Sequence, residues 1–308
     1  MNPRPDQEPR FVSPLSDYGF KVTFGNQHKT LFLRQALQAL LASPVPIESV
    51  SFEQTTFEGA TADSRAGLYD LACTDAAGNY FLVEMQVGRF PQFLQRMKFY
   101  AFTKFNTLVK RGDFDFARLP RIYGVGILQH SIFPDLPGYH QLVNLRNAEG
   151  ALLDTQLQLI TVELAKFDEN APAITDLEKL LHFMKSLTKL RQLPEYPLFY
   201  REQWLREAIE ELDRTAMSAD ERAYLEMSIA REAVVLRSQK DDVEQARAQA
   251  LAEGKAEGEA MGKAEGKMEA EVALIQSMLR SGGLSLAQIA EYTGKTVAFV
   301  TEIKARLR

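Results

Sequence analysis

In the first half of the chain, apolar residues gather in short runs bounded by turn residues, a pattern typical of β-strands. The strands predicted from these runs are 47–52, 68–74, 80–87, 121–128 and, with weaker patterns, 139–145 and 157–164. Residues 75–79, Asp-Ala-Ala-Gly-Asn, separate the second of these strands from the third and predict a hairpin. At least two strands are therefore expected to lie side by side.

Apolar residues spaced three and four positions apart predict helices, and this spacing dominates after about Phe167. The predicted helices are 30–41, 91–110, 174–187 and 202–212. Residues 11–24 lack such a pattern and are expected to be turn-rich. The first half is therefore predicted to be mixed α/β, and an all-helical C-terminal extension follows it.

A long polar helix is predicted from Ser218 to about Leu279, because Ser218 and Glu221 match a capping box. Within it, glycine recurs every four residues, at Gly254, Gly258, Gly262 and Gly266. Each glycine costs a helix about 1 kcal/mol relative to alanine, which favours a solvated low-complexity spacer. The alternative is a helix face on which two helices approach closely.

The tail contains two short helical patterns, 285–292 and 296–307, joined through Gly294. They outline a helix-turn-helix-like module, with a small oligomerisation cap as the alternative. Four segments are expected: a core at 11–167, a helical subdomain at 168–217, a charged glycine-repeat helix at 218–271 and the tail at 272–308.

Composition excludes a disordered or collagen-like chain, since 45% of the 308 residues are hydrophobic and 25% are charged. The net charge of -5 argues at first against a nucleic-acid partner. By region, however, 201–270 carries 11 basic against 17 acidic residues, whereas 87–130 carries eight basic against two acidic ones. The acidity belongs to the polar helix, and the region after the third strand is compatible with DNA.

The single cysteine, Cys73, excludes an internal disulfide and any multi-cysteine metal site. No apolar run is long enough to span a membrane, and residues 1–10 lack the apolar segment of a signal peptide. We therefore expect a soluble cytoplasmic protein without a membrane partner. Neither GxxxxGK[ST] nor GxGxxG occurs, so no nucleotide cofactor is expected.

Two of the predicted strands carry isolated acids among apolar residues, Asp70 in LYDLACT and Glu84 in FLVEMQV. Buried carboxylates are costly unless they are paired, protonated or bound to a cation. Together with the Met85 carbonyl and the Gln86 side chain, the two acids suit a Mg²⁺ ion that keeps several waters and binds a phosphate. The alternative is that both are structural acids paired with Arg or Lys.

The pattern Asp70…Glu84-Met85-Gln86, followed by a basic helix, resembles the core motif of PD-(D/E)XK nucleases. With the opening Ser-Pro-Leu-Ser-Asp-Tyr-Gly-Phe-Lys at 13–21 and the stretch 101–112, the chain resembles the Rpn family of recombination-promoting nucleases and transposases over about 11–300. This resemblance implies an α/β fold with a PD-(D/E)XK restriction-endonuclease-like core, in which a mixed central sheet is flanked by helices. It further implies a metal-dependent DNA endonuclease, linked to recombination, transposition or defence against foreign DNA.

The resemblance also implies roles for individual residues. Asp70, Glu84 and the Met85 carbonyl are expected to bind Mg²⁺ or Mn²⁺, with Asp17 as a fourth candidate ligand. Gln86 stands where the family motif has a catalytic lysine and cannot supply its positive charge. Either Arg96 or Lys98 takes that role, or the metal alone activates water, or catalysis is lost.

Four basic residues are candidates for DNA phosphate contacts: Lys21, Arg89, Arg96 and Lys98. The expected partners are DNA and a second copy of the chain, a dimer formed through the long helix. The competing hypothesis is a catalytically weak DNA-binding or assembly protein that keeps the nuclease fold.

Overall fold

The computed structural model describes residues 9–43, 45–57, 67–88, 90, 92–109, 112, 115–190 and 196–307. The chain forms two compact units, Met1–Leu236 and Arg237–Arg308, which are considered separately below. In the described residues no helix is both long and apolar enough to cross a membrane.

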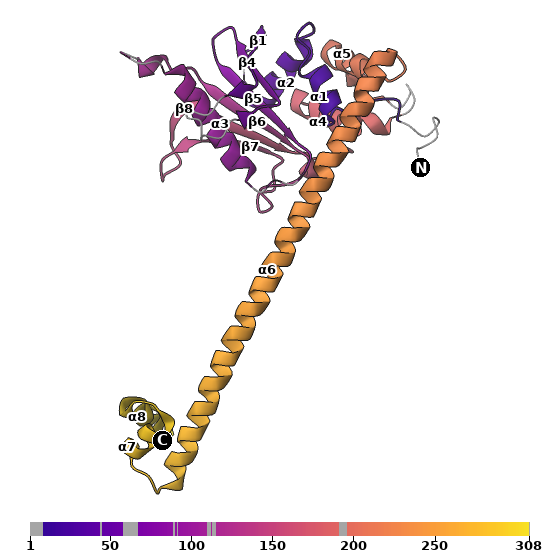
Figure 1. Ribbon diagram of the computed structural model, residues 1–308. Coiled ribbons are helices and arrows are strands. Elements are labelled where there is room, and N and C mark those ends of the chain that lie inside the picture. Colours follow the sequence, from indigo (N-terminus) through magenta and orange to yellow (C-terminus); the bar gives the residue numbers. More distant parts are fainter. Residues whose placement is uncertain are drawn as a thin grey trace. The chain divides into compact units, whose positions relative to one another are not determined.

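The first unit is built on a six-stranded mixed sheet with the strand order β1-β4-β5-β6-β8-β7 (Figure 1). These strands are β1 (Val50–Phe52), β4 (Leu71–Asp75), β5 (Tyr80–Gln86), β6 (Ile122–Leu128), β7 (His140–Arg146) and β8 (Leu152–Glu163). The central strands β5, β6 and β8 run parallel, and the other neighbours pair antiparallel. A separate pair consists of β2 (Thr56–Phe57) and β3 (Gly67–Leu68). The predicted α/β class with a mixed sheet is confirmed.

Helices cover both faces of this sheet. They are α1 (Asp17–Thr23), α2 (Leu31–Leu41), α3 (Phe93–Leu108), α4 (Asp176–Ser186) and α5 (Gln203–Leu212). Short 3₁₀ turns are η2 (Phe116–Arg118), η3 (Leu164–Lys166), η4 (Leu187–Lys189) and η6 (Leu198–Arg201). The main core joins α1, α2, α4 and α5 to one face, and α3 packs on the other. With both faces covered, all seven residues of β6 are buried, as expected for a central parallel strand.

The packing of α3 depends on a glycine in β6. A Cβ atom at Gly126 would lie 2.4 Å from Cε1 of Phe93, whose ring is fully buried at the start of α3. The missing side chain therefore lets the first turn of α3 approach the sheet closely. That first turn lies beside the carboxyl ends of β5 and β6, where ligands commonly bind in open α/β sheets.

Three sequence predictions need correction. Residues 17–23, expected to be turn-rich, form α1, whose N-terminus is capped by Ser16 accepting a hydrogen bond from the Gly19 N–H. The strand predicted at 157–164 begins earlier, at Leu152. Asp70 lies in a bend before β4 and not within a strand.

A long helix, α6 (Ala219–Ser281), begins at the predicted capping box of Ser218 and Glu221. The second unit gathers its C-terminal end with α7 (Leu286–Thr293) and α8 (Val297–Arg306) around a small apolar core. Gly294 ends α7 with a left-handed φ of 64°, which glycine adopts without strain. The outline predicted for the tail, two short helices joined at this glycine, is confirmed.

Candidate active site

Glu84 lies near the carboxyl end of β5, on the sheet face that α3 covers. Side chains alternate along a strand, so Glu84 shares its face with Leu82, which packs against Ala101 of α3. The residue is only 4% exposed. An ionised carboxylate in this position requires a compensating charge.

Asp70 lies at the surface beside the end of β5. Its Oδ2 accepts a hydrogen bond of 2.7 Å from the backbone N–H of Met85. The N–H and C=O of one strand residue point to the same side, so the Met85 carbonyl faces the edge where Asp70 lies. The structure thus brings Asp70 and the backbone of Met85 together.

Arg96, from the first turns of α3, joins Glu84 to Gln86. Its Nη2 donates to Glu84 Oε2 at 3.0 Å and to Gln86 Oε1 at 2.9 Å. The guanidinium also lies over the rings of Phe90 and Phe93, 4.7 and 5.4 Å from their centroids. These contacts place a permanent positive charge beside Gln86, the residue that stands where the PD-(D/E)XK motif has lysine.

Arg96 alone does not compensate the charges of both Asp70 and Glu84. Among the described residues, the buried Oε1 of Glu84 has no hydrogen-bond partner. Burial, and then repulsion from Asp70, raises the pKa of Glu84 to about 8 in spite of Arg96. Although Asp70 is exposed as a residue, protein packed around its carboxyl raises its pKa too, against the opposing effects of the Met85 N–H and Arg96. Further positive charge is therefore favoured here.

The comparison with known proteins agrees with this arrangement. The family model of the PD-(D/E)XK nuclease family transposase matches residues 14–234. The chain belongs to this family. The match is consistent with the resemblance to Rpn proteins, and it indicates nuclease-type chemistry on nucleic acid. No curated protein and no solved structure matches the chain.

PD-(D/E)XK nucleases generally use divalent metal ions, and the residues present fit such an ion. Carboxylate, carbonyl and amide oxygens are the ligands that Mg²⁺ prefers, and Glu84 offers an oxygen that nothing described engages. In the described part of the chain, no three His, Cys, Asp or Glu side chains gather as a metal cluster. The described residues therefore offer two acids at this position, which suits an ion that takes its other ligands from backbone, water and phosphate.

Asp17 and Lys21 lie in the first helix of the family match and influence Asp70 electrostatically. Asp17 raises the pKa of Asp70 and Lys21 lowers it, so both are near, but the contacts of Asp17 are to other groups. Its Oδ2 accepts from Lys21 Nζ at 2.9 Å and from Ser228 Oγ at 3.1 Å. The structure does not place Asp17 with Asp70 and Glu84 in one ligand set.

The other predicted phosphate contacts differ in position. Lys98 is exposed on α3, two residues after Arg96. Arg89 lies outside the described residues. The side chain of Arg96 points toward Glu84 and Gln86, so it lies within the site and not on a free surface.

Sequence reasoning missed the contribution of α6 to this region. Ser228 is buried against α1. Glu232, one turn further along α6, has a pKa raised by burial, and a hydrogen bond from the backbone of Asp17 opposes that rise. The available signal was the spacing of Leu225, Ser228 and Glu232, which share one helix face, with Leu225 buried in the main core. The polar character of the rest of the helix concealed it.

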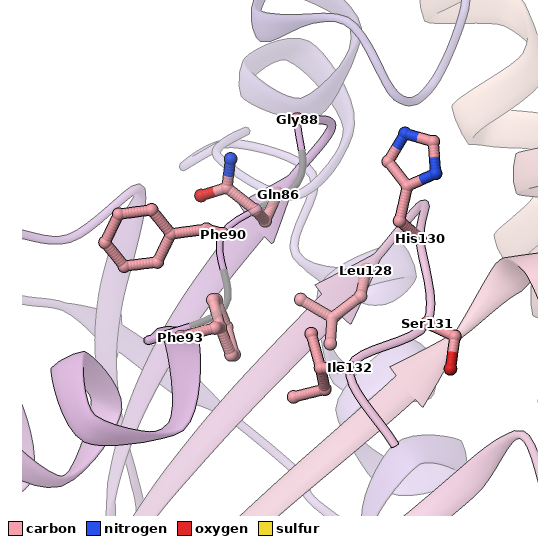
Figure 2. A pocket seen from close by; sticks show the side chains of 8 residues that line it. All are labelled: Gln86, Gly88, Phe90, Phe93, Leu128, His130, Ser131 and Ile132. Atoms are coloured by element: carbon pink, nitrogen blue, oxygen red, sulfur yellow. The ribbon is translucent and has the colours of Figure 1, made fainter. Parts of the chain in front are cut away.

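A pocket of about 200 Å³ opens beside the acids, at the carboxyl ends of β5 and β6. Figure 2 shows Gln86 and Phe90 on one side of it, Leu128 and Ile132 in its middle, and His130 and Ser131 across from them. Gln86 belongs both to this pocket and to the Arg96 contact. The pocket is thus linked to Glu84 through Gln86 and Arg96.

Proposed function

We propose that the protein is a Mg²⁺-dependent DNA endonuclease, able to use Mn²⁺, that serves recombination, transposition or defence against foreign DNA. The observation that carries the proposal is the acid pair: Glu84 is buried with an unengaged oxygen and a raised pKa beside Asp70. Membership of a nuclease family then makes a phosphodiester the natural substrate.

In this proposal Asp70, Glu84 and the Met85 carbonyl hold the ion. A divalent cation bound there supplies positive charge to a phosphodiester and makes water more acidic. The Met85 N–H orients Asp70 by holding one of its oxygens. Glu84 would hold the ion as a carboxylate, because a nearby cation favours the ionised form that burial disfavours here.

Arg96 takes the role of the lysine that the motif lacks at Gln86. The 2.9 Å hydrogen bond from Arg96 to Gln86 Oε1 supports this role, because it holds the guanidinium beside the residue that stands where the motif has lysine. Two other hypotheses are that the metal alone activates the water and that catalysis has been lost. The nicking assay decides between them. Lys21, Arg89 and Lys98 are proposed to contact flanking phosphates, as basic residues near a phosphodiester site commonly do.

A second candidate function rests on the Arg96–Glu84 ion pair itself. If that pair only neutralises a buried acid, the protein binds DNA or assembles on it without cutting. We also propose that the C-terminal helices act as a helix-turn-helix-like DNA-binding module, that α6 mediates a dimer, and that the protein works in the cytoplasm. The four-segment division at 167, 217 and 271 remains part of this proposal.

Plasmid nicking tests the endonuclease. Wild-type protein is expected to convert supercoiled plasmid to nicked and linear forms with Mg²⁺ or Mn²⁺ and not with EDTA. Asp70→Ala and Glu84→Ala are each expected to lower the rate at least about 100-fold, the size of effect found when a catalytic electrostatic group is removed. Metal-dependent nicking that survives both substitutions would contradict the site, and no nicking with either metal would favour the second function.

A further inference from the structure

We propose that the pocket beside the acid pair binds one unpaired nucleobase of the DNA strand whose phosphate lies at Asp70 and Glu84. The inference rests on the proposed function, because it assigns a substrate feature to the same site. It names a binding site separate from the acids, formed by the ends of β5 and β6 and the start of α3.

The chemistry of the pocket suits a flat, uncharged ligand. Its apolar part is formed by Phe90, Phe93, Leu128 and Ile132. The polar residues are Gln86, His130 and Ser131. Among the described residues, none of those that line it is an Asp, Glu, Lys or Arg, and the guanidinium of Arg96 beside it is already engaged by Glu84 and Gln86. An apolar slot with a few hydrogen-bonding groups is the usual environment of a base taken out of its stack.

The size of the pocket limits the ligand to a small one. Pockets for drug-sized ligands span about 300–1,000 Å³, whereas this one holds about 200 Å³. It accommodates a single base and not a dinucleotide. Gln86 lines the pocket and also contacts Arg96, which pairs with Glu84, so the base is proposed to belong to a nucleotide adjoining the phosphate held at the acids.

The pocket is built by buried interactions and is not an incidental gap between side chains. Glu163, which is fully buried at the end of β8, accepts hydrogen bonds from the N–H groups of Ile132 and Phe133 and from Ser131 Oγ. These bonds fix the loop that forms one wall. On the opposite side, Gly126 allows the ring of Phe93 to sit against β6.

Arg96 connects this pocket to the acids. It donates to Gln86 Oε1, which leaves the Nε2 end of that amide as the donor available to a ligand. It also covers the Phe90 ring at 4.7 Å. A base entering the pocket would therefore meet an oriented amide and an aromatic ring held in place by a cation.

A base paired within a duplex cannot reach such a pocket, so the proposal makes the protein selective for unpaired or distorted DNA. Stacking on an aromatic side chain contributes about 1–3 kcal/mol per base, which corresponds to roughly 5- to 150-fold in affinity. That discrimination is measurable without cleavage.

The test compares two single-stranded oligonucleotides of equal length, one with normal bases and one with abasic spacers throughout, so that phosphate charge is constant. Fluorescence anisotropy in Ca²⁺ measures the affinity of the full chain for each. We expect wild-type protein to prefer the base-bearing strand at least about 5-fold. Equal affinity for the two strands, or no measurable binding to either, overturns the proposal.

Ile132→Trp is designed to fill the pocket while its backbone N–H still bonds Glu163. It should lower affinity for the base-bearing strand to that of the abasic strand and leave the latter unchanged. Leu142→Trp, at a half-exposed position of β7, is the matched control and should keep the wild-type preference. Phe90→Ala, which empties the pocket rather than filling it, should reduce the preference too and guards against misfolding of the tryptophan variant.

Failure of this proposal is distinguishable from failure of the endonuclease. Asp70→Ala should abolish nicking and retain the preference for bases. Nicking by a wild-type protein that shows no base preference would overturn the pocket alone. A base preference without nicking would overturn the endonuclease and leave the pocket in place.

Discussion

Two buried glutamates illustrate how its partners set the pKa of a buried carboxylate. Burial would raise the pKa of Glu163, but the Lys166 ammonium and the Phe133 and Ile132 N–H groups outweigh it and the pKa is lowered. Glu84 is exposed to a similarly small degree, yet its Oε1 has no hydrogen-bond partner among the described residues, and its pKa is raised to about 8. Each oxygen of Glu163 thus has a described partner, through Lys166 and the loop N–H groups, whereas Glu84 has an oxygen that a cation could engage.

Replacing Glu84 should therefore alter the pH dependence of stability. Between about pH 4.3, where an unfolded glutamate ionises, and about pH 8, folded Glu84 holds a proton that the unfolded chain has released. The contribution of Glu84 to the free energy of unfolding of the wild-type protein therefore falls as the pH rises from about 4.3 to about 8. We expect the difference in Tm, Glu84→Gln minus wild type, to grow by at least about 3 °C from pH 5 to pH 8 in metal-free buffer.

Thermal unfolding followed by circular dichroism with EDTA present checks this expectation. Glu163→Gln is the matched control, because the lowered pKa of Glu163 predicts the opposite sign: that substitution should cost more at pH 7 than at pH 3.5. If the difference in Tm between Glu84→Gln and the wild type is the same at pH 5 and pH 8, the pKa of Glu84 is not raised in the folded protein.

Removing Arg96 should impair both the acid pair and the reaction. Arg96→Gln takes away the charge that lowers the pKa of Glu84 and the donor that holds Gln86. We expect a fall in single-turnover nicking of about 100-fold. Arg118→Gln is the control, since Arg118 is 84% exposed and pairs only with nearby Asp115 among the described residues. Equal rates for the two variants would restrict Arg96 to a structural role.

The sequence identified the acids better than their partners. Asp70 and Glu84 could be found because a lone acid among apolar residues is conspicuous within the chain itself, and Gln86 follows two positions after Glu84 on the same strand face. The stacking of Arg96 on Phe90 could not, because it depends on how α3 packs on the sheet. Glu163 has the same local pattern as Glu84, and only its partners from the 131–133 loop and Lys166 distinguish the two.

At the scale of secondary structure, the site depends on the close contact of α3 with β6. Two glycines in β6 make room for it, but their neighbours differ. A Cβ at Gly126 would meet the rigid ring of Phe93 at 2.4 Å, whereas one at Gly124 would meet the flexible ends of Leu159 at 2.7 Å and Met97 at 3.2 Å. Rigid neighbours cannot yield without moving the helix.

Gly126→Ala should therefore destabilise the protein more than Gly124→Ala. We expect a loss of about 1–3 kcal/mol in the free energy of unfolding for Gly126→Ala, and roughly half of that or less for Gly124→Ala. Urea denaturation of both variants measures the difference. Because Phe93 also lines the pocket, Gly126→Ala should weaken the preference for base-bearing DNA; equal losses of stability would mean that Phe93 moves aside freely.

Regular patterns let the sequence predict most elements closely. The hairpin of β4 and β5, the buried strand β6 and the helices α2 to α5 follow from spacing and turn residues alone. The helix α1 was missed because it has only seven residues, too few for a periodic pattern. The bend at Asp70 was missed because apolar residues on both sides of it continue the appearance of a strand.

At the scale of the whole molecule, α6 connects two units that have separate cores. Where side chains are described, residues 237–270 of the helix are exposed. Leu251 and Met261 are 74% and 65% exposed, and glycines at 254 and 258 lie between them. Gly254 and Met261 are seven residues apart, as are Leu251 and Gly258. All four positions therefore follow the spacing of the residues at which two helices meet in a coiled coil.

We expect the full chain to be a dimer by multi-angle light scattering, and the double variant Leu251→Lys/Met261→Lys to be a monomer, because charges on the seam repel. Leu153→Lys, at a β8 residue that is 69% exposed, is the control and should remain dimeric. A monomeric wild-type chain, or a double variant that stays dimeric, would remove α6 from the assembly and favour its role as a solvated spacer.

The repeated segment of α6 also bears on how the length of this protein can change. Residues 254–257 and 262–265 read Gly-Lys-Ala-Glu in both copies, eight positions apart. One copy more or less would change the helix by eight residues, which is about 12 Å of length. Neither core contains any part of the repeat. The length of α6 could therefore change by whole copies of the repeat without altering the buried residues of either unit.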